Sequence, residues 1–94
     1  MMSKTPVELG KVGRRERDME IMRTAIVAEL DAISLYQQLA SQTDNVSMKK
    51  VLLHVAREEK THFGEFQEML LRTDGEQVQE LDKAKEEVRE LTEK

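Results

Sequence analysis

Three residues of this chain have the types and the spacing of metal ligands. Glu59 and His62 stand three positions apart, so in a helix both side chains lie one turn apart and can reach a single ion. A second glutamate, Glu29, stands on an earlier segment. Carboxylate and imidazole donors together suit Fe(II), Mn(II) and Zn(II), and the donor set alone does not choose among them. The chain has no cysteine, which excludes disulfides, thiolate-bound zinc, iron–sulfur clusters and a cysteine nucleophile.

The three residues fall on apolar stripes that have the spacing of packed helices. Two series of residues follow alternating steps of three and four, the a and d pattern of helices in a bundle. The earlier series is Met22, Ile26, Glu29, Ile33, Tyr36 and Ala40, and the later one is Met48, Leu52, Val55, Glu59, His62, Phe66 and Met69. Two carboxylates and one imidazole therefore occupy positions that are otherwise mostly apolar.

Burying a carboxylate in such a stripe costs several kcal/mol unless it is paired or bound to a metal. If the chain turns near residues 44–45, Glu29 lies about 15 residues before the turn, and Glu59 and His62 lie about 15 to 17 residues after it. These separations place all three about 23 Å from the turn along antiparallel helices, at 1.5 Å per residue. The spacing therefore predicts one metal site at a single level of a helical hairpin.

The segments that position these residues are predicted to be helices. Residues 15–43 lack glycine and proline, the residues 43–45 are of capping type, and a second helical run covers 46–72 and ends near Gly75. Two long helices joined by so short a turn lie antiparallel. Asp74 with Gln77 forms a capping box, after which an amphipathic pattern predicts a third helix. Its apolar positions are Val78, Leu81, Val88 and Leu91.

The chain is therefore predicted to be one all-α unit, because 94 residues leave room for a single core. We expect an N-terminal arm over 1–14, a hairpin over 15–73 and a C-terminal amphipathic helix over 74–94. No apolar run approaches the roughly 20 residues of a membrane span, and residues 1–10 lack a signal core, so we expect a cytoplasmic protein without membrane contact. The net charge of −4, from 15 basic and 19 acidic residues, argues against a nucleic-acid partner.

Other polar residues of the two helices are interpreted as surface residues. His54 lies beside the stripe, and Glu58 and Glu65 flank it, as solvated carboxylates of a helix commonly do. Tyr36 follows Glu29 by one heptad, about 10 Å along the helix, so it is too far away to be a direct ligand in the same subunit. Either its hydroxyl hydrogen-bonds a ligand carboxylate, of its own or of a second chain, or its ring packs in the core with the hydroxyl at water.

Three donors make half of a two-metal site. In four-helix di-iron carboxylate proteins, two helices each supply one Glu and two each supply a Glu-x-x-His pair. One hairpin supplies one of each, so a two-fold dimer would assemble the donors for two ions. Both helices also carry apolar residues that a hairpin partner is not expected to cover: Val27, Leu30, Leu35, Val51, Phe63 and Leu70. The third helix could cover one such stripe, and the remaining face predicts a self-complementary contact.

The stretches AIVAELDAISLYQQLA and VAREEKTHFGEF resemble the pattern of the encapsulated ferritins, and of the ferritin-like domain fused to some encapsulin shell proteins. The resemblance runs from Arg15 to Leu91. It implies a ferritin-like four-helix bundle formed by dimerisation. It also implies ferroxidase activity, in which Fe(II) is oxidised by dioxygen or peroxide for iron storage and detoxification. The implied ligands are Glu29, Glu59 and His62, with Tyr36 close to the catalytic centre.

The resemblance also implies a di-iron centre with two irons per dimer, where Zn, Mn or Ca can substitute. It implies a ring of dimers such as a decamer, an encapsulin shell protein as partner, and a location inside an encapsulin nanocompartment in the cytoplasm. Two features depart from the family. The sequence stops at Lys94 without a segment that could dock to a shell, and Ala28 replaces an acidic residue found in some members. Asp31 remains, so a secondary metal-uptake site is left open.

Two other functions are compatible with the residues. One is a helical dimerisation module whose stripe charges pair with each other or hold a structural zinc. The other is a peroxide-reducing di-iron protein related to rubrerythrins, which the absence of cysteine disfavours because a rubredoxin-type iron centre needs thiolates.

Overall fold

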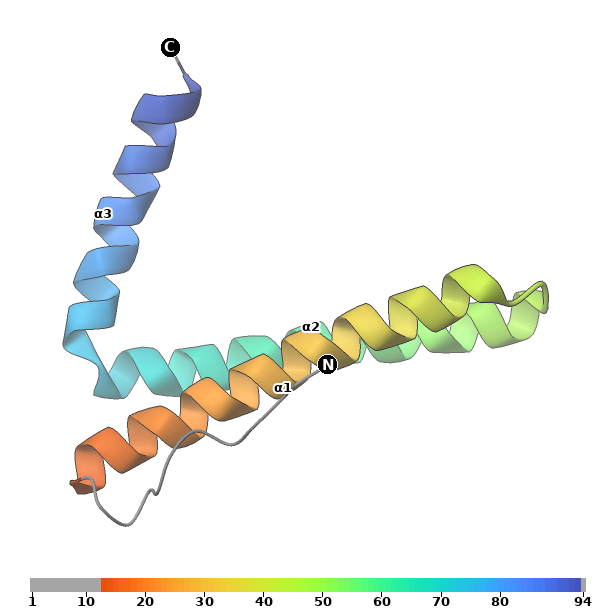
Figure 1. Ribbon diagram of the computed structural model, residues 1–94, viewed down its shortest axis with the longest axis horizontal. Coiled ribbons are helices and arrows are strands. Elements are labelled where there is room, and N and C mark those ends of the chain that lie inside the picture. Colours follow the sequence, from red (N-terminus) through yellow and green to blue (C-terminus); the bar gives the residue numbers. More distant parts are fainter. Residues whose placement is uncertain (1–12, 94) are drawn as a thin grey trace.

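A computed structural model describes residues 13–93, and these residues form three α-helices. Helix α1 spans Arg14–Gln42, α2 spans Val46–Thr73 and α3 spans Gly75–Thr92. Helices α1 and α2 form an antiparallel hairpin, and α3 leaves the end of α2 at a steep angle (Figure 1). Residues 13–93 contain no strand, so the predicted all-α class, with a hairpin followed by a third helix, is confirmed. Of the predicted N-terminal arm, residues 1–12 lie outside the described part.

Side chains at the two turns define where the helices begin. Oδ1 of Asn45 accepts a hydrogen bond from the N–H of Met48 at 3.0 Å and caps α2. Oδ1 of Asp74 accepts one from the N–H of Gln77 at 3.0 Å, which is one half of the predicted capping box. The N–H of Asp74 donates to the carbonyl of Leu70 at 2.8 Å instead of to the Gln77 side chain. Helix α2 therefore ends at Thr73, and Gly75 already belongs to α3.

The contact between α1 and α2 centres on small side chains. Ala40 of α1 and Ala56 of α2 are each 2% exposed, and Leu70 is 7% exposed. Every residue of the predicted α1 stripe is at least half-buried. On α2, however, Met48, His62 and Met69 are exposed, whereas Ala56, Phe63 and Leu70 turn toward α1. The prediction that Phe63 and Leu70 need a partner beyond the hairpin was therefore wrong, because the buried side of α2 is shifted toward Ala56, Phe63 and Leu70. The rest of the predicted α2 stripe stays at least half-buried: Leu52, Val55, Glu59 and Phe66. The other residues expected to lack cover within the hairpin are exposed: Val27, Leu30, Leu35 and Val51.

Helix α3 points away from the hairpin and contacts α2 only where the two helices meet (Figure 1). It makes no contact with α1 within residues 13–93, so it does not cover an apolar stripe of the hairpin, a role that the sequence left open to it. The result is a flat, angled molecule that extends 47 × 45 × 20 Å. None of the described helices combines the length and the apolar character that a membrane crossing requires.

Candidate metal centre

The middle of the hairpin brings together the three residues that the sequence selected. Glu29 comes from α1, and Glu59 and His62 come from successive turns of α2. One ligand atom from each residue lies within 4.8 Å of the other two. The antiparallel register places them at one level because the short turn at residues 43–45 leaves nearly equal helix lengths on either side.

The two carboxylates of the cluster are largely buried, whereas its imidazole is exposed. Nδ1 of His62 lies 3.4 Å from Oε2 of Glu59 and 3.7 Å from Oε2 of Glu29. The two glutamate side chains are 16% and 19% exposed, but the histidine side chain is 48% exposed. The carboxylates are therefore held between the helices, while the imidazole stands at the edge of the hairpin, where a second molecule could approach.

The two carboxyl groups influence each other's protonation. A hydrogen bond from the protonated Glu29 carboxyl to Glu59 raises the pKa of Glu29, and burial raises it further. The same hydrogen bond lowers the pKa of Glu59, and a hydrogen bond to His62 lowers it as well. The pKa of His62 is raised, first by its hydrogen bond to Glu59. In the absence of a metal, the cluster therefore retains protons that a bound cation would displace.

One atom of the cluster lacks a hydrogen-bond partner. Oε2 of Glu29 is buried and accepts no hydrogen bond from any described residue. Leaving a buried polar group unsatisfied costs about 1–3 kcal/mol. A divalent cation beside this oxygen would remove the cost, and two carboxylates with one imidazole are donors that suit iron, manganese and zinc. The residues present therefore fit a metal ion.

The remaining candidate residues lie outside the cluster. Tyr36 is half-buried and belongs to none of the hydrogen bonds found within residues 13–93, so its two possible roles stay open. His54 lies 3.3 Å from Glu58, and both side chains are more than half exposed, in accord with surface residues. Glu65 is exposed and is not one of the three converging ligands, in accord with its interpretation as a solvated carboxylate. Its charge, one turn after His62, makes the smallest of the contributions that raise the pKa of Glu29 and of His62.

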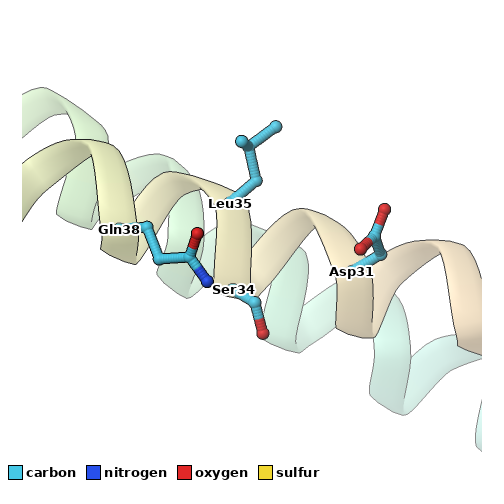
Figure 2. A pocket seen from close by; sticks show the side chains of 4 residues that line it. All are labelled: Asp31, Ser34, Leu35 and Gln38. Atoms are coloured by element: carbon cyan, nitrogen blue, oxygen red, sulfur yellow. The ribbon is translucent and has the colours of Figure 1, made fainter. Parts of the chain in front are cut away.

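Asp31 lies on a different surface of α1 from the cluster. Together with Ser34, Leu35 and Gln38 it lines a shallow pocket of about 410 Å³. Figure 2 shows these four side chains along the outside of α1, over about two turns of the helix. Asp31 is not one of the three residues whose ligand atoms converge. Whether Asp31 belongs to a secondary metal-uptake site, which the sequence left open, is not decided by its position.

The edge of the hairpin that carries His62 is unusually apolar for an uncovered surface. We define the His62 face by six large side chains, which are 41–61% exposed: Ile21, Leu35 and Leu39 of α1, and Met48, Val51 and Met69 of α2. At about 100° per residue, all six lie on the same side of the plane that contains the two helix axes. Ile21 and Met69 line one pocket, which confirms that the two helices present these residues to the same side.

Comparison with known proteins agrees with this fold. A match to the EncFtn-like family covers residues 5–88. The chain is 52% identical over 88 residues to a ferritin-like–encapsulin shell fusion protein of Pyrococcus furiosus, covering 94% of this chain and 26% of that protein. It is 40% identical over 84 residues to the encapsulin nanocompartment cargo protein EncC of Myxococcus xanthus, covering 86% of this chain and 65% of that protein. It thus spans about a quarter of the first relative and just under two thirds of the second.

A solved structure is also similar over nearly the whole chain. The crystal structure of the encapsulated ferritin domain from Pyrococcus furiosus superposes with a TM-score of 0.83 at 47% sequence identity, covering 97% of this chain and 98% of that one. An all-α hairpin with a carboxylate and histidine cluster is thus a ferritin-like arrangement, and the chain belongs to the EncFtn-like family. The resemblance inferred from the motifs around Glu29 and Glu59 is confirmed.

Proposed function

We propose that this chain is one half of a ferroxidase, in which two copies bind Fe(II) as substrate and oxidise it to Fe(III). The observation that carries the proposal is the buried Oε2 of Glu29, which accepts no hydrogen bond within the described residues although it lies beside Glu59 and His62. A cluster that only stabilised the hairpin would be expected to satisfy its buried oxygen. An oxygen left without a donor at the centre of three converging ligands is typical of a site that takes a cation.

The second half of the site would come from another copy across the His62 face. The six exposed apolar side chains of this face surround the edge at which His62 stands, and burying them would stabilise a dimer. Two copies would supply four carboxylates and two imidazoles. Four carboxylates neutralise two Fe(II) ions, so substrate binding would leave little net charge in the new interface.

Each residue has a distinct part in this proposal. Glu29 and Glu59 bind the ion and must release their shared proton when it enters, because a metal displaces protons from its ligands. His62 supplies the nitrogen donor at the open edge, and Tyr36 supports a ligand carboxylate of the second copy through its hydroxyl. When bound, iron supplies the redox chemistry: each Fe(II) loses one electron to dioxygen or peroxide. The chain's residues hold the ions side by side and balance their charge.

We further propose that the protein works inside an encapsulin nanocompartment in the cytoplasm and serves iron storage or detoxification. One similar protein carries a fused encapsulin shell and another is named as an encapsulin cargo protein, which supports a shell protein as partner. In the first relative, the region similar to this chain makes up 26% of the whole. A ring of dimers such as a decamer is the expected form of the assembly.

Anaerobic titration with Fe(II), followed by exposure to air, tests the ferroxidase activity. We expect two irons to bind per dimer and the absorbance of Fe(III) to develop within seconds to minutes after air is admitted. His62→Ala and Glu59→Gln should abolish rapid oxidation, whereas the matched surface variants His54→Ala and Glu58→Gln should keep it. Iron that binds without oxidation, or full activity in the His62 and Glu59 variants, would contradict the proposal.

A structural-metal dimerisation module is the second candidate, favoured by the ion pairs that His62 already makes with both glutamates. The same titration separates the two functions. A structural site would bind Zn(II) and raise the unfolding temperature, but would leave added Fe(II) oxidising at the rate of free iron in buffer.

A further inference from the structure

Nε2 of His62 has no hydrogen-bond partner within the described residues. The other ring nitrogen, Nδ1, faces the two glutamates, 3.4 Å from Oε2 of Glu59 and 3.7 Å from Oε2 of Glu29. Because the two nitrogens of an imidazole point in widely different directions, Nε2 points away from the glutamates, on a side chain that is 48% exposed. If Nδ1 binds a metal, the ring proton must stay on Nε2, where a hydrogen-bond acceptor would hold it.

A ligand histidine is oriented by the group that its second nitrogen contacts. Metal-bound histidines almost always donate their other ring N–H to a carboxylate, a carbonyl oxygen or water, and this bond fixes both the tautomer and the direction of the ring. His62 needs such a bond, because nearly half of its side chain is exposed and packing does not hold the ring on all sides. The residue that supplies the acceptor would belong to the metal site without touching the ion.

Three exposed glutamates of α2 are candidates for this acceptor, and two of them are already paired. Oε1 of Glu58 lies 3.3 Å from Nε2 of His54. Oε2 of Glu68 accepts a hydrogen bond from Nε of Arg72 at 2.9 Å. The side chain of Glu65 makes no hydrogen bond or ion pair with any described residue. Glu65 is therefore the exposed glutamate of α2 that could accept a new hydrogen bond without breaking another.

The helix directs the side chain of Glu65 toward His62. Residues three positions apart in a helix lie one turn apart on the same face. Side chains also lean toward the N-terminal end of their helix, so Glu65 leans over the turn that carries His62, whereas Glu58 leans away from it. The pKa of His62 is raised first by its hydrogen bond to Glu59, and the nearby charge of Glu65 adds to this effect. An extended glutamate side chain at position 65 can therefore bring a carboxylate oxygen to Nε2.

We propose that Glu65 is a positioning residue of the metal centre, whose carboxylate accepts a hydrogen bond from the Nε2–H of His62 when Nδ1 binds the ion. The proposal rests on the proposed function only in taking Glu29, Glu59 and His62 as the metal ligands. The bond keeps the ring proton on Nε2, so the lone pair of Nδ1 stays directed at the ion. The negative charge also raises the basicity of the imidazole and strengthens its bond to the metal.

Zinc binding to the full chain, measured by competition with a coloured chelator, tests this role without a redox reaction. Glu65→Ala should raise the Kd for Zn(II) about tenfold, the lower end of the loss that removing such a partner causes. Glu65→Gln keeps a carbonyl oxygen that can accept from Nε2–H, so it should recover part of the affinity. The matched controls Glu58→Ala and Glu68→Ala should bind zinc as wild type does. All three side chains are exposed, so the variants should keep their fold, which circular dichroism checks.

Nitrogen NMR of the zinc-loaded protein measures the state of the ring itself. Wild type and Glu65→Gln should show Nδ1 of His62 bound to the metal and a proton on Nε2 that exchanges slowly with water. In Glu65→Ala this proton should exchange fast, because water replaces the carboxylate as its acceptor. A merely structural loss would weaken zinc binding without changing the exchange of this one proton.

Three results would overturn the proposal. These are a Glu65→Ala variant that binds zinc as tightly as wild type, an Nε2 proton that exchanges equally fast in both, or a loss of affinity that Glu65→Gln shares in full and high salt removes. The last result would show that Glu65 only attracts the cation from a distance. Iron oxidation is a separate readout. If Glu65→Ala weakens zinc binding as expected but wild type does not oxidise iron, the proposed ferroxidase function is wrong and the role of Glu65 stands.

Discussion

Replacing Glu29 by glutamine should stabilise the metal-free protein and weaken its response to metal. The carboxylate oxygen Oε2 of Glu29 is buried without a hydrogen-bond donor, and the neighbouring Glu59 carboxylate repels it when both are ionised. Glutamine has nearly the same size and can donate an amide N–H to Glu59. The substitution therefore removes an electrostatic cost from the apo protein while it removes one ligand from the metal site.

The size of this effect follows from the burial of the side chain. An unsatisfied buried polar group costs about 1–3 kcal/mol. Since 16% of the Glu29 side chain remains exposed and water can reach part of it, we expect a gain near the lower end, about 1–2 kcal/mol. For a chain of this size, 1 kcal/mol corresponds to about 4–8 °C in Tm. Glu29→Gln should thus raise the Tm of the metal-free protein by about 4 °C or more.

The stability that Glu29→Gln gains over wild type should increase with pH. The pKa of Glu29 is raised in the folded chain, so the folded state holds this proton more tightly than the unfolded state does. The stability due to the protonated form is complete below the ordinary value of 4.5 and is lost as the pH rises through the higher folded pKa. The advantage of Glu29→Gln should therefore be small at about pH 4 and reach its full size at neutral pH.

Thermal unfolding in the presence of a chelator, at equal chain concentration, measures the difference. Added Zn(II) should reverse the order, because a ligand at 100 times its Kd stabilises the wild type by about 2.7 kcal/mol, more than the variant gains. Glu58→Gln is the control, since this exposed carboxylate should change the stability by less than about 0.5 kcal/mol. A Glu29 variant that is no more stable than wild type under chelation at neutral pH would refute the reasoning.

Three further substitutions test the cap of α3, the contact between α1 and α2, and the role of Tyr36. Asp74→Ala removes the cap of α3 and the partner of Arg23, so we expect the free energy of unfolding to fall by about 1–2 kcal/mol. Relative to wild type, amide hydrogen exchange should become faster in α3 than in α1. Ala56→Leu, at a position 2% exposed, should cost about 1–3 kcal/mol in urea denaturation, whereas Ala84→Leu on exposed α3 should change little. Tyr36→Phe should slow iron oxidation without changing the number of irons bound. An unchanged rate would make Tyr36 a packing residue.

Local sequence signals predicted most of the secondary structure and the composition of the cluster. Asn45 and Asp74 are capping residues by type, and both cap helices in the structure. The apolar steps of three and four predicted two long helices, and the short turn between them brought Glu29 level with Glu59 and His62. These features depend on intervals of a few residues and on the near-equal lengths of the helices about the turn, so they can be inferred without knowledge of packing.

The rotation of α2 could not be inferred in the same way. The apolar stripe of α2 is wide, so either of its two sides could face α1. The sequence alone does not show which side does. In the structure Ala56, Phe63 and Leu70 turn inward, because a small side chain at position 56 lets the helices approach, as Ala40 does from α1. This choice leaves His62 at the open edge, where a second copy could share the site.

The sequence by itself thus determined the three helices and the residues that could bind a metal, because periodicity and capping act over one or two turns. The tertiary structure decided which oxygen is buried without a partner, which apolar side chains stay exposed around His62, and where α3 points. At the bend between α2 and α3, Arg15 and Arg23 of α1 reach Thr73 and Asp74 across more than fifty residues of chain. Such contacts have no local signal, since they exist only after the hairpin has closed.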